Sequence, residues 1–258
     1  MSRGLFVQAV RVSFASRAAY RGDFLLSLVV TLLFEAMTPL VTVLIYGLGA
    51  SFPGWSVAEA LLIQAIFLIA RGIAYPTFFG IAWSVFDRVR EGTFELILLR
   101  PRSPLLVLMA ESFDAPGFGR FLGGAGLFAY ALARLPAPGP LSILLAFLLL
   151  ALSVLVLFSF VLLMAGSLFV WVGNGRLQEV TESIMVFAQF PSSIYGRALQ
   201  VVFAVVMPVS MIAFLPAQAL LGRPQPLTLF AIPACLVFFG ACLVFWRNMM
   251  GRYAGGGG

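Results

Sequence analysis

Carboxylates are the side chains of this sequence that could do chemistry, and their spacing argues against catalysis. Glu111 and Asp114 lie three residues apart in an apolar stretch, which places both on one face of a helix. An intramembrane aspartyl protease needs two Asp residues on facing helices, one of them in a Gly-x-Gly-Asp motif. The chain contains only Asp23, Asp87 and Asp114, and none lies in that motif. The sequence therefore does not predict an intramembrane enzyme.

The basic residues exclude other reaction types. All 16 are Arg, and the chain has no Lys and no His. A P-loop needs a Lys against the phosphates, and Ser-His, Cys-His and Ser-Lys nucleophile pairs need residues that are missing here. Cys235 and Cys242 are seven residues apart, about 10 Å along a helix, too far for a disulfide. We predict no metal site, no directly bound cofactor and no ATP hydrolysis by the chain itself.

Composition predicts an all-α polytopic membrane protein. Hydrophobic residues make up 62% of the 258 residues and charged residues only 10%, whereas a soluble domain has about 25% charge. Apolar runs of about 20 residues recur, the length that crosses a bilayer as a helix. The net charge of +6 is interpreted as a topology signal rather than as nucleic-acid binding. Six transmembrane helices are predicted, over 24–48, 59–84, 105–132, 141–171, 177–195 and 227–246.

Arginine placement predicts that both termini are cytoplasmic. Segments 1–23, 85–104, 172–182 and 247–258 hold eleven Arg residues, while the segments predicted outside hold only three. Short loops rich in Arg stay on the cytoplasmic side. We divide the chain into a cytoplasmic interfacial helix over 1–23, one transmembrane domain over 24–254 and a disordered tail over 255–258.

The N-terminal segment has the spacing of an amphipathic helix that lies on the membrane. The alternative is a plain basic flank of the first span. Arg residues interrupt residues 1–23, so we do not expect a cleavable signal peptide.

The region from 183 to 223 contains helix breakers that divide it into pieces too short to span singly. Broken apolar helices at membrane depth need protein or a water-filled cavity around them. We predict a re-entrant hairpin over 196–222 that acts as a gate. Its residues are Pro191, Tyr195, Gly196, Pro208 and Pro216.

Charged residues also fall inside the predicted spans. Glu35 and Arg71 each lie about 12 residues into their spans, so antiparallel neighbours would bring them to the same depth, where a lone charge costs about 3 kcal/mol. They are either a structural pair or part of a substrate path. Glu111 and Asp114 either line a cavity or lie at the inner interface with Arg100 or Arg102. Arg120 is the fifth intramembrane charge.

The longest charged segment between two apolar runs is DRVREGTFELILLRPRSP, residues 87–104. Asp87, Glu91 and Glu95 have helical spacing, and several Phe, Leu and Ile residues give the segment an apolar side. Pro101 and Pro104 end it before the next span. A helix with charge and exposed apolar groups suits docking into a soluble partner; the alternative is a solvated loop.

Residues VREGTFELILLRPRSPL resemble the cytoplasmic segment of ABC-2-type exporter permeases, with its Gly-Thr-hydrophobic-Glu-hydrophobic-Leu-Leu-Arg-Pro pattern. FAQFPSSIYGRALQVVFAVVMPVSMIAFLPAQALLG is similar to the fifth span and re-entrant region of that family, and FWRNMMGRYAGGG to its C-terminal end. Gly196 departs from the family pattern, which has a second Pro there.

The resemblance implies the permease subunit of an ATP-driven exporter in the bacterial cytoplasmic membrane. Such permeases pair with a second, identical or similar permease and with two copies of a separate ATPase subunit, which binds ATP and Mg. The exported substrate would be hydrophobic or amphipathic. An ion-coupled transporter or channel using Glu35, Arg71 and Asp114 is the alternative. The residues implied to couple to the ATPase are Arg88, Arg90, Glu91, Gly92, Thr93, Phe94, Glu95 and Arg100.

Overall fold

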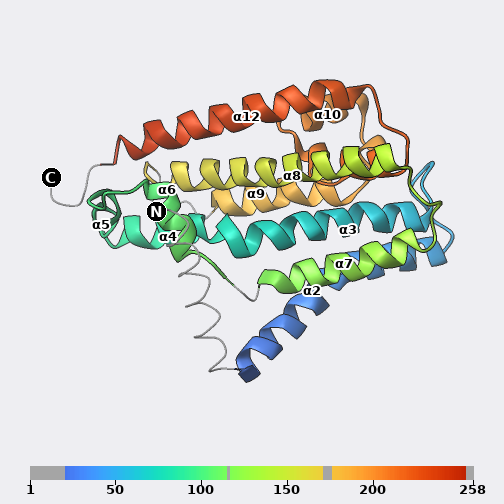
Figure 1. Ribbon diagram of the computed structural model, residues 1–258, viewed down its shortest axis with the longest axis horizontal. Helices are drawn as coiled ribbons and strands as arrows, with labels where there is room; N and C mark the ends of the chain where they lie inside the picture. The colour runs from blue at the N-terminus through green and yellow to red at the C-terminus, as the bar shows by residue number, and fades with distance from the viewer. Residues whose placement is uncertain (1–20, 115–116, 171–175, 254–258) are drawn as a thin grey trace.

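The computed structural model describes residues 21–114, 117–170 and 176–253. In these ranges the chain forms a bundle of helices that run along one long axis (Figure 1). Residues 1–20 of the expected interfacial helix lie outside the described residues. The tail over 255–258 lies outside them too.

The described α-helices are α2 (Arg21–Gly47), α3 (Val57–Ala74), α4 (Gly80–Arg90), α5 (Glu95–Leu98), α6 (Pro104–Glu111), α7 (Phe118–Leu132), α8 (Pro140–Ser167), α9 (Arg176–Val186), α10 (Arg197–Val201), α11 (Phe214–Leu220) and α12 (Leu227–Met250). π-helical turns cover Tyr75–Phe79 and Val202–Val206, and 3-10 turns cover Phe187–Gln189, Ser192–Ile194 and Val209–Met211.

Four helices in the described residues are long and apolar enough to cross a membrane: Gly22–Gly47, Val57–Arg90, Pro140–Ser167 and Leu227–Met250. They agree with the predicted first, second, fourth and sixth spans. The predicted third span is not one helix, because it is divided into α6 and α7. At 15 residues, α7 is about 22 Å long, less than the roughly 30 Å of hydrocarbon. The six-span topology therefore stays a prediction.

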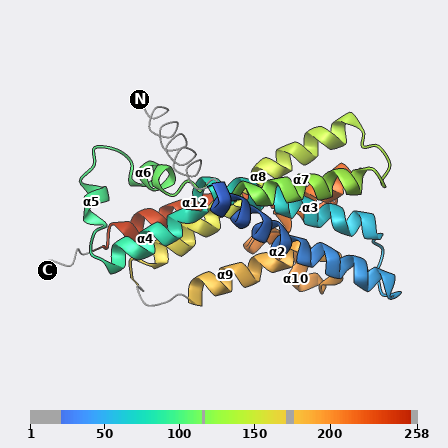
Figure 2. The ribbon, with the colours of Figure 1, turned by 90° about the horizontal axis from the view of Figure 1, so that it is seen from below.

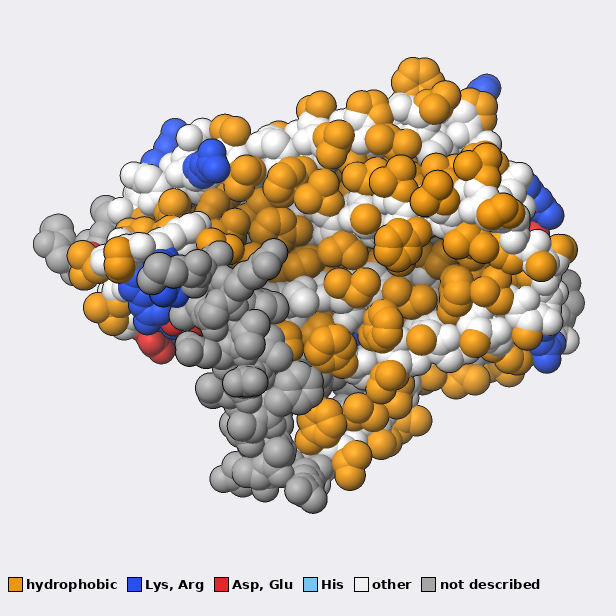
Figure 3. Space-filling model, viewed as in Figure 1, with side chains coloured by type: hydrophobic (Ala, Val, Ile, Leu, Met, Phe, Trp, Pro, Cys, Tyr) orange, Lys and Arg blue, Asp and Glu red, His pale blue; other side chains and the backbone are white. Residues whose placement is uncertain are grey.

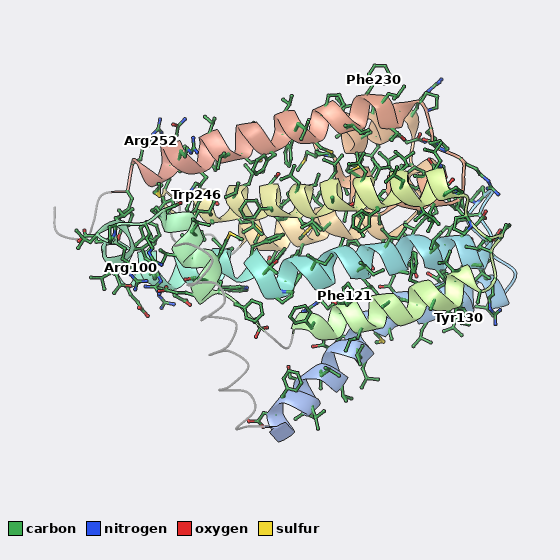
Figure 4. All side chains as sticks on the ribbon, in the orientation of Figure 1. Arg100, Phe121, Tyr130, Phe230, Trp246 and Arg252 are labelled. Atoms are coloured by element: carbon green, nitrogen blue, oxygen red, sulfur yellow. The ribbon has the colours of Figure 1, made fainter. Side chains whose placement is uncertain are left out.

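The surface has the polarity of a membrane protein. Hydrophobic side chains cover the middle of the face seen in Figure 3, while basic side chains gather toward its two ends. Figure 4 places Arg100 and Arg252 near one end of the bundle, and Tyr130 and Phe230 near the other. The segment between α4 and α6 and the last described residues thus share one end, here called the coupling end.

The helix Val57–Arg90 forms the centre of the bundle, and its apolar stretch is far more buried than those of the other candidate spans. Its start is fixed by a capping box, in which the Ser56 side chain accepts from the Glu59 N–H and the Glu59 side chain accepts from the Ser56 N–H. Glycines let α7 pack directly on α3. A Cβ on Gly124 would lie 2.7 Å from the Ile69 nitrogen, and one on Gly72 would overlap the Phe121 backbone.

Residues between α9 and α12 form short helical pieces, of which α11 is buried and α10 is exposed, and the ends of this region lie together. The indole Nε1–H of Trp55 donates to Ser193 Oγ at 2.8 Å, and Arg223 pairs with Glu59 at 3.1 Å. Trp55 and Glu59 lie at the start of α3, so residues 194–222 leave and return at the end opposite the coupling end. Between them, α11 is buried along its whole length against α8 and α3.

Candidate functional site

The charged segment after the second span is a turn with a short helix, because Gly92 ends α4. Gly92 has a φ of +70°, which costs glycine little. The N–H of Thr93 donates to the Arg88 carbonyl at 2.8 Å, and the N–H of Gly92 donates to the Val89 carbonyl at 3.3 Å. These two bonds form a Schellman C-cap. The helix expected across Asp87, Glu91 and Glu95 is therefore interrupted, and Thr93 does not cap α5 with its side chain.

Phe94 anchors the segment to the bundle. Its side chain is fully buried and meets the rings of Phe169 and Tyr253 edge-on, with ring centroids 4.8 and 5.4 Å away. These rings come from the end of α8 and from the C-terminal residues. In this structure Phe94 holds the segment in place and presents no surface to a partner, unlike the contact role that the family resemblance implied for it.

The exposed part of the segment combines charge with apolar groups. Arg90, Glu91, Gly92, Glu95 and Arg100 are exposed. Leu96, Leu98 and Leu99 are exposed beside them, with Leu99 at 79%. Figures 1 and 2 both show α5 at the tip of the bundle.

Glu111 ties both arms of the segment to α6. One carboxylate oxygen accepts from Arg88 at 2.7 Å, and the other accepts a short hydrogen bond from Arg100. Arg88 precedes the turn and Arg100 follows it. Of the two partners that the sequence suggested for Glu111, Arg100 and Arg102, the structure shows the contact with Arg100. Two of the arginines predicted to contact the ATPase are thus bound within the chain.

Asp114 lies in the break between α6 and α7, where it is half-buried. Its backbone N–H donates to the Pro76 carbonyl in the π turn at 3.1 Å. A Cβ on Gly117 would lie 3.0 Å from the Pro76 nitrogen, so the break packs closely on this turn.

Glu35 joins two arginines from two other helices. Its carboxylate lies 2.7 Å from Arg120 Nε and 3.6 Å from Arg71 Nη1. The side chains are 14% exposed for Glu35, 23% for Arg120 and 18% for Arg71. Both guanidinium groups also lie over the Tyr75 ring, and Arg71 donates to the Tyr75 hydroxyl at 2.6 Å. We refer to these four residues as the buried charge network.

The expected contact between Glu35 and Arg71 is present, but sequence reasoning missed Arg120 as the closer partner. Arg120 lies about midway through the predicted third span, so the depth comparison that paired Glu35 with Arg71 would also have found it.

The predicted gate residues fall at the joints between short helical pieces. Pro191 precedes Ser192–Ile194, Pro208 precedes Val209–Met211, and Pro216 lies in the first turn of α11. Gly196 precedes α10 with an extended conformation. The Tyr195 hydroxyl donates to the Phe187 carbonyl at 3.3 Å, and its ring packs edge-on against Phe203. Tyr195 therefore joins the end of α9 to the π turn Val202–Val206.

The fold and these sites define a multi-pass helical membrane protein with a charged segment at one end and a broken apolar region at the other. A sequence profile for the ABC-2 family transporter protein matches residues 32–257. The chain therefore belongs to the ABC-2 family, whose permeases are transmembrane transport subunits that work with ATPase subunits in general. No curated protein and no solved structure matches this chain.

Proposed function

We propose that this protein is the permease subunit of an ATP-driven exporter in a bacterial cytoplasmic membrane, with both termini cytoplasmic. Two copies of a separate ATPase bind ATP and Mg and dock on the coupling end. A second permease, identical or homologous, completes the transporter. The substrate is hydrophobic or amphipathic.

One observation carries this proposal. The family-like segment 85–104 projects from the bundle while remaining anchored at Phe94 and Glu111. Its exposed leucines and charges offer a docking surface, because apolar anchors ringed by charge are typical of protein interfaces. Because Phe94 and Glu111 hold the segment against the bundle, a movement of the docked ATPase would be passed from that surface to α4 and α6.

The opposite end supplies the gate. Residues 194–222 begin at the Trp55 contact and end at the Glu59 contact. They form the re-entrant hairpin of the proposed topology, which closes the path on the outer face. Opening requires these two contacts to release the hairpin.

The alternative, an ion-coupled transporter, needs Glu35, Arg71 and Asp114 to act as one group. Glu35 and Arg71 do share the buried charge network. Family membership favours the ATP-driven function, since ABC-2 permeases work with ATPase subunits.

Co-purification tests the proposal. The chain is co-expressed with a candidate ABC-type ATPase subunit from the same genome, and the complex is captured through a tag on the permease. We expect the ATPase to co-purify, and Leu99→Asp to lower its recovery at least tenfold. Leu48→Asp is the matched control, because Leu48 is 87% exposed and follows the last residue of α2, away from the segment. Equal recovery with both variants would contradict the proposed docking surface.

A further inference from the structure

An apolar groove of about 630 Å³ lies between the broken region after α9 and the last helix, α12. One wall carries Val201, Val205 and Val206, from α10 and the π turn that follows it. The other wall is formed by residues of α12 between Leu227 and Ala241. The residues that line the groove are Val, Leu, Phe, Pro and Ala, so the groove suits an apolar group.

Both walls begin at the end of the bundle opposite the coupling end. α10 begins four residues after Ser193 and α12 begins four residues after Arg223, and these two residues bind at the start of α3. Figure 4 shows Phe230, a residue of the groove wall, near that same end. The stretch from Leu227 to Ala241 extends about 21 Å along α12, which is about two thirds of a roughly 30 Å hydrocarbon core.

The groove opens toward lipid. Val206, Phe230 and Val237 on its walls are largely exposed, and α12 is a candidate membrane span. Phe203 and Ala204 bury the opposite side of the π turn, whereas every residue of α10 is exposed or half-buried. An open void between the two walls would forfeit the dispersion contacts of its lining. A lipid tail is as apolar as Leu and would restore those contacts.

Arg197 lies at the mouth of the groove. It precedes Val201 and Val205 by four and eight residues, so it shares the helix face that lines the groove. Its side chain is exposed and forms no ion pair within the part of the chain that the structure describes. Arg223 at the same end, by contrast, already has Glu59 as its counter-ion. A guanidinium group without a counter-ion suits a phosphate, which it can bind through two parallel hydrogen bonds.

We propose that this groove binds an anionic phospholipid of the membrane, with an acyl chain between α10 and α12 and the phosphate on Arg197. The chain adds little preference for one lipid, because the bilayer offers every tail a similar environment. Arg197 therefore sets the preference, and it favours a headgroup with net negative charge. The bound chain would also pack α10 against α12. Only the assignment to the outer leaflet rests on the proposed topology, since the site needs neither an ATPase nor a transported substrate.

Native mass spectrometry of the purified chain in a nonionic detergent tests the site. The protein is titrated with phosphatidylglycerol, or with phosphatidylcholine that carries the same acyl chains, and the lipid-bound peaks are quantified. We expect the first site to take phosphatidylglycerol about fivefold more tightly, the factor that one arginine near a membrane surface contributes. Equal affinity for both lipids, or no saturable binding of phosphatidylglycerol, would overturn the inference.

A pair of arginine variants locates the headgroup. Arg197→Gln should abolish the preference for phosphatidylglycerol and leave the affinity for phosphatidylcholine unchanged. Arg134→Gln is the matched control, because Arg134 is also exposed near this end but follows α7, where its guanidinium group lies over the Tyr130 ring. An unchanged preference in Arg197→Gln, or an equal loss in both variants, would contradict the assignment of the phosphate to Arg197.

Ala234→Phe tests the groove itself. Ala234 lines the middle of the α12 wall, and a phenyl group there should occupy the space of the acyl chain and lower the affinity for both lipids several-fold. The same spectra report how many chains each particle contains. If both affinities stay unchanged, the lipid does not lie in the groove. If a dimer separates while both affinities stay unchanged, a second copy of the chain covers the groove instead. Either result would overturn the inference, and the Arg197→Gln comparison remains decisive if this variant fails to fold.

The outcome is separable from the fate of the proposed function, because the titration contains no ATPase and no ATP. Lipid binding without ATPase co-purification would remove the exporter function and leave the lipid site. Co-purification without selective lipid binding would leave the exporter function and remove the lipid site.

Discussion

The backbone N–H of Asp114 donates to the carbonyl of Pro76 at 3.1 Å, joining the break between α6 and α7 to the π turn Tyr75–Phe79. A π turn shifts the helical hydrogen-bond ladder and can free a carbonyl for an outside donor. The two interruptions are therefore one structural unit. On one side of this hydrogen bond α7 packs tightly on α3. On the other side α6 contacts α4 and α5, which belong to the charged segment 85–104 or lead into it.

The contact between Gly72 and the Phe121 backbone predicts a large effect from one methyl group. Gly72→Ala should destabilise the protein by about 1–3 kcal/mol, because backbone atoms cannot yield to the added Cβ as a side chain can. Gly126→Ala on α7 is the matched control, since a Cβ there has no neighbour within 4 Å. Thermal unfolding in detergent measures both. Equal melting temperatures would show that α3 and α7 can separate at no cost.

The buried charge network predicts an order of coupling energies. A double-mutant cycle between Glu35→Ala and Arg120→Ala should give a larger coupling than one between Glu35→Ala and Arg71→Ala, because the distances are 2.7 and 3.6 Å. Glu35→Ala alone should cost about 3 kcal/mol, since it leaves two guanidinium groups without their carboxylate. The free energy of unfolding is measured for each variant. A larger coupling with Arg71 would contradict the geometry.

Sequence patterns predicted the parts of this fold that depend on local composition. Apolar length located four candidate spans, and Pro191, Pro208 and Pro216 marked where the region after α9 breaks, because proline removes a donor and ends helical runs. Matched depth predicted that Glu35 and Arg71 would meet. Each of these inferences uses residue spacing along the chain and a roughly known membrane thickness.

The remaining features depend on contacts between distant residues. Phe94 is buried because Phe169 and Tyr253, far away in sequence, meet its ring. A cavity beside Arg71 is lined by Phe67 from α3 and by Met185 from α9, which are far apart in the sequence. The helical spacing of Asp87, Glu91 and Glu95 predicted one helix, whereas Gly92 ends α4 between them. Periodicity reports which residues would share a helix face, without showing that the helix continues.

Glu111 contacts both Arg88 and Arg100, which predicts that it controls the mobility of the segment 85–104. Glu111→Gln should speed amide hydrogen exchange in residues 91–103 several-fold, because the partly exposed ion pairs with Arg88 and Arg100 are worth about 0.2–1 kcal/mol each. Glu91→Gln is the control, since Glu91 is exposed in the same segment. Mass spectrometry of the exchanged peptides gives the rates. If both variants exchange alike, Phe94 alone holds the segment.

The placement of residues 194–222 predicts that Arg197 and Arg223 lie on the same, outer side of the membrane. Arg223 pairs with Glu59 beside the Trp55 loop, and Arg197 is exposed four residues after Ser193, which accepts the hydrogen bond from Trp55. Single Cys residues at either position should therefore react with a membrane-impermeant maleimide in intact cells. The background carries Ser in place of Cys235 and Cys242, both of which are buried.

Arg100→Cys supplies the opposite-side control, because Arg100 lies at the coupling end and should react only after the cells are opened. Arg197 follows the half-buried Tyr195, so labelling of denatured protein sets the full signal for each site. Labelling at one position but not the other would mean that the chain crosses the membrane between them. The number of spans would then be odd, and Arg100 and the C-terminus could not both be cytoplasmic with the N-terminus.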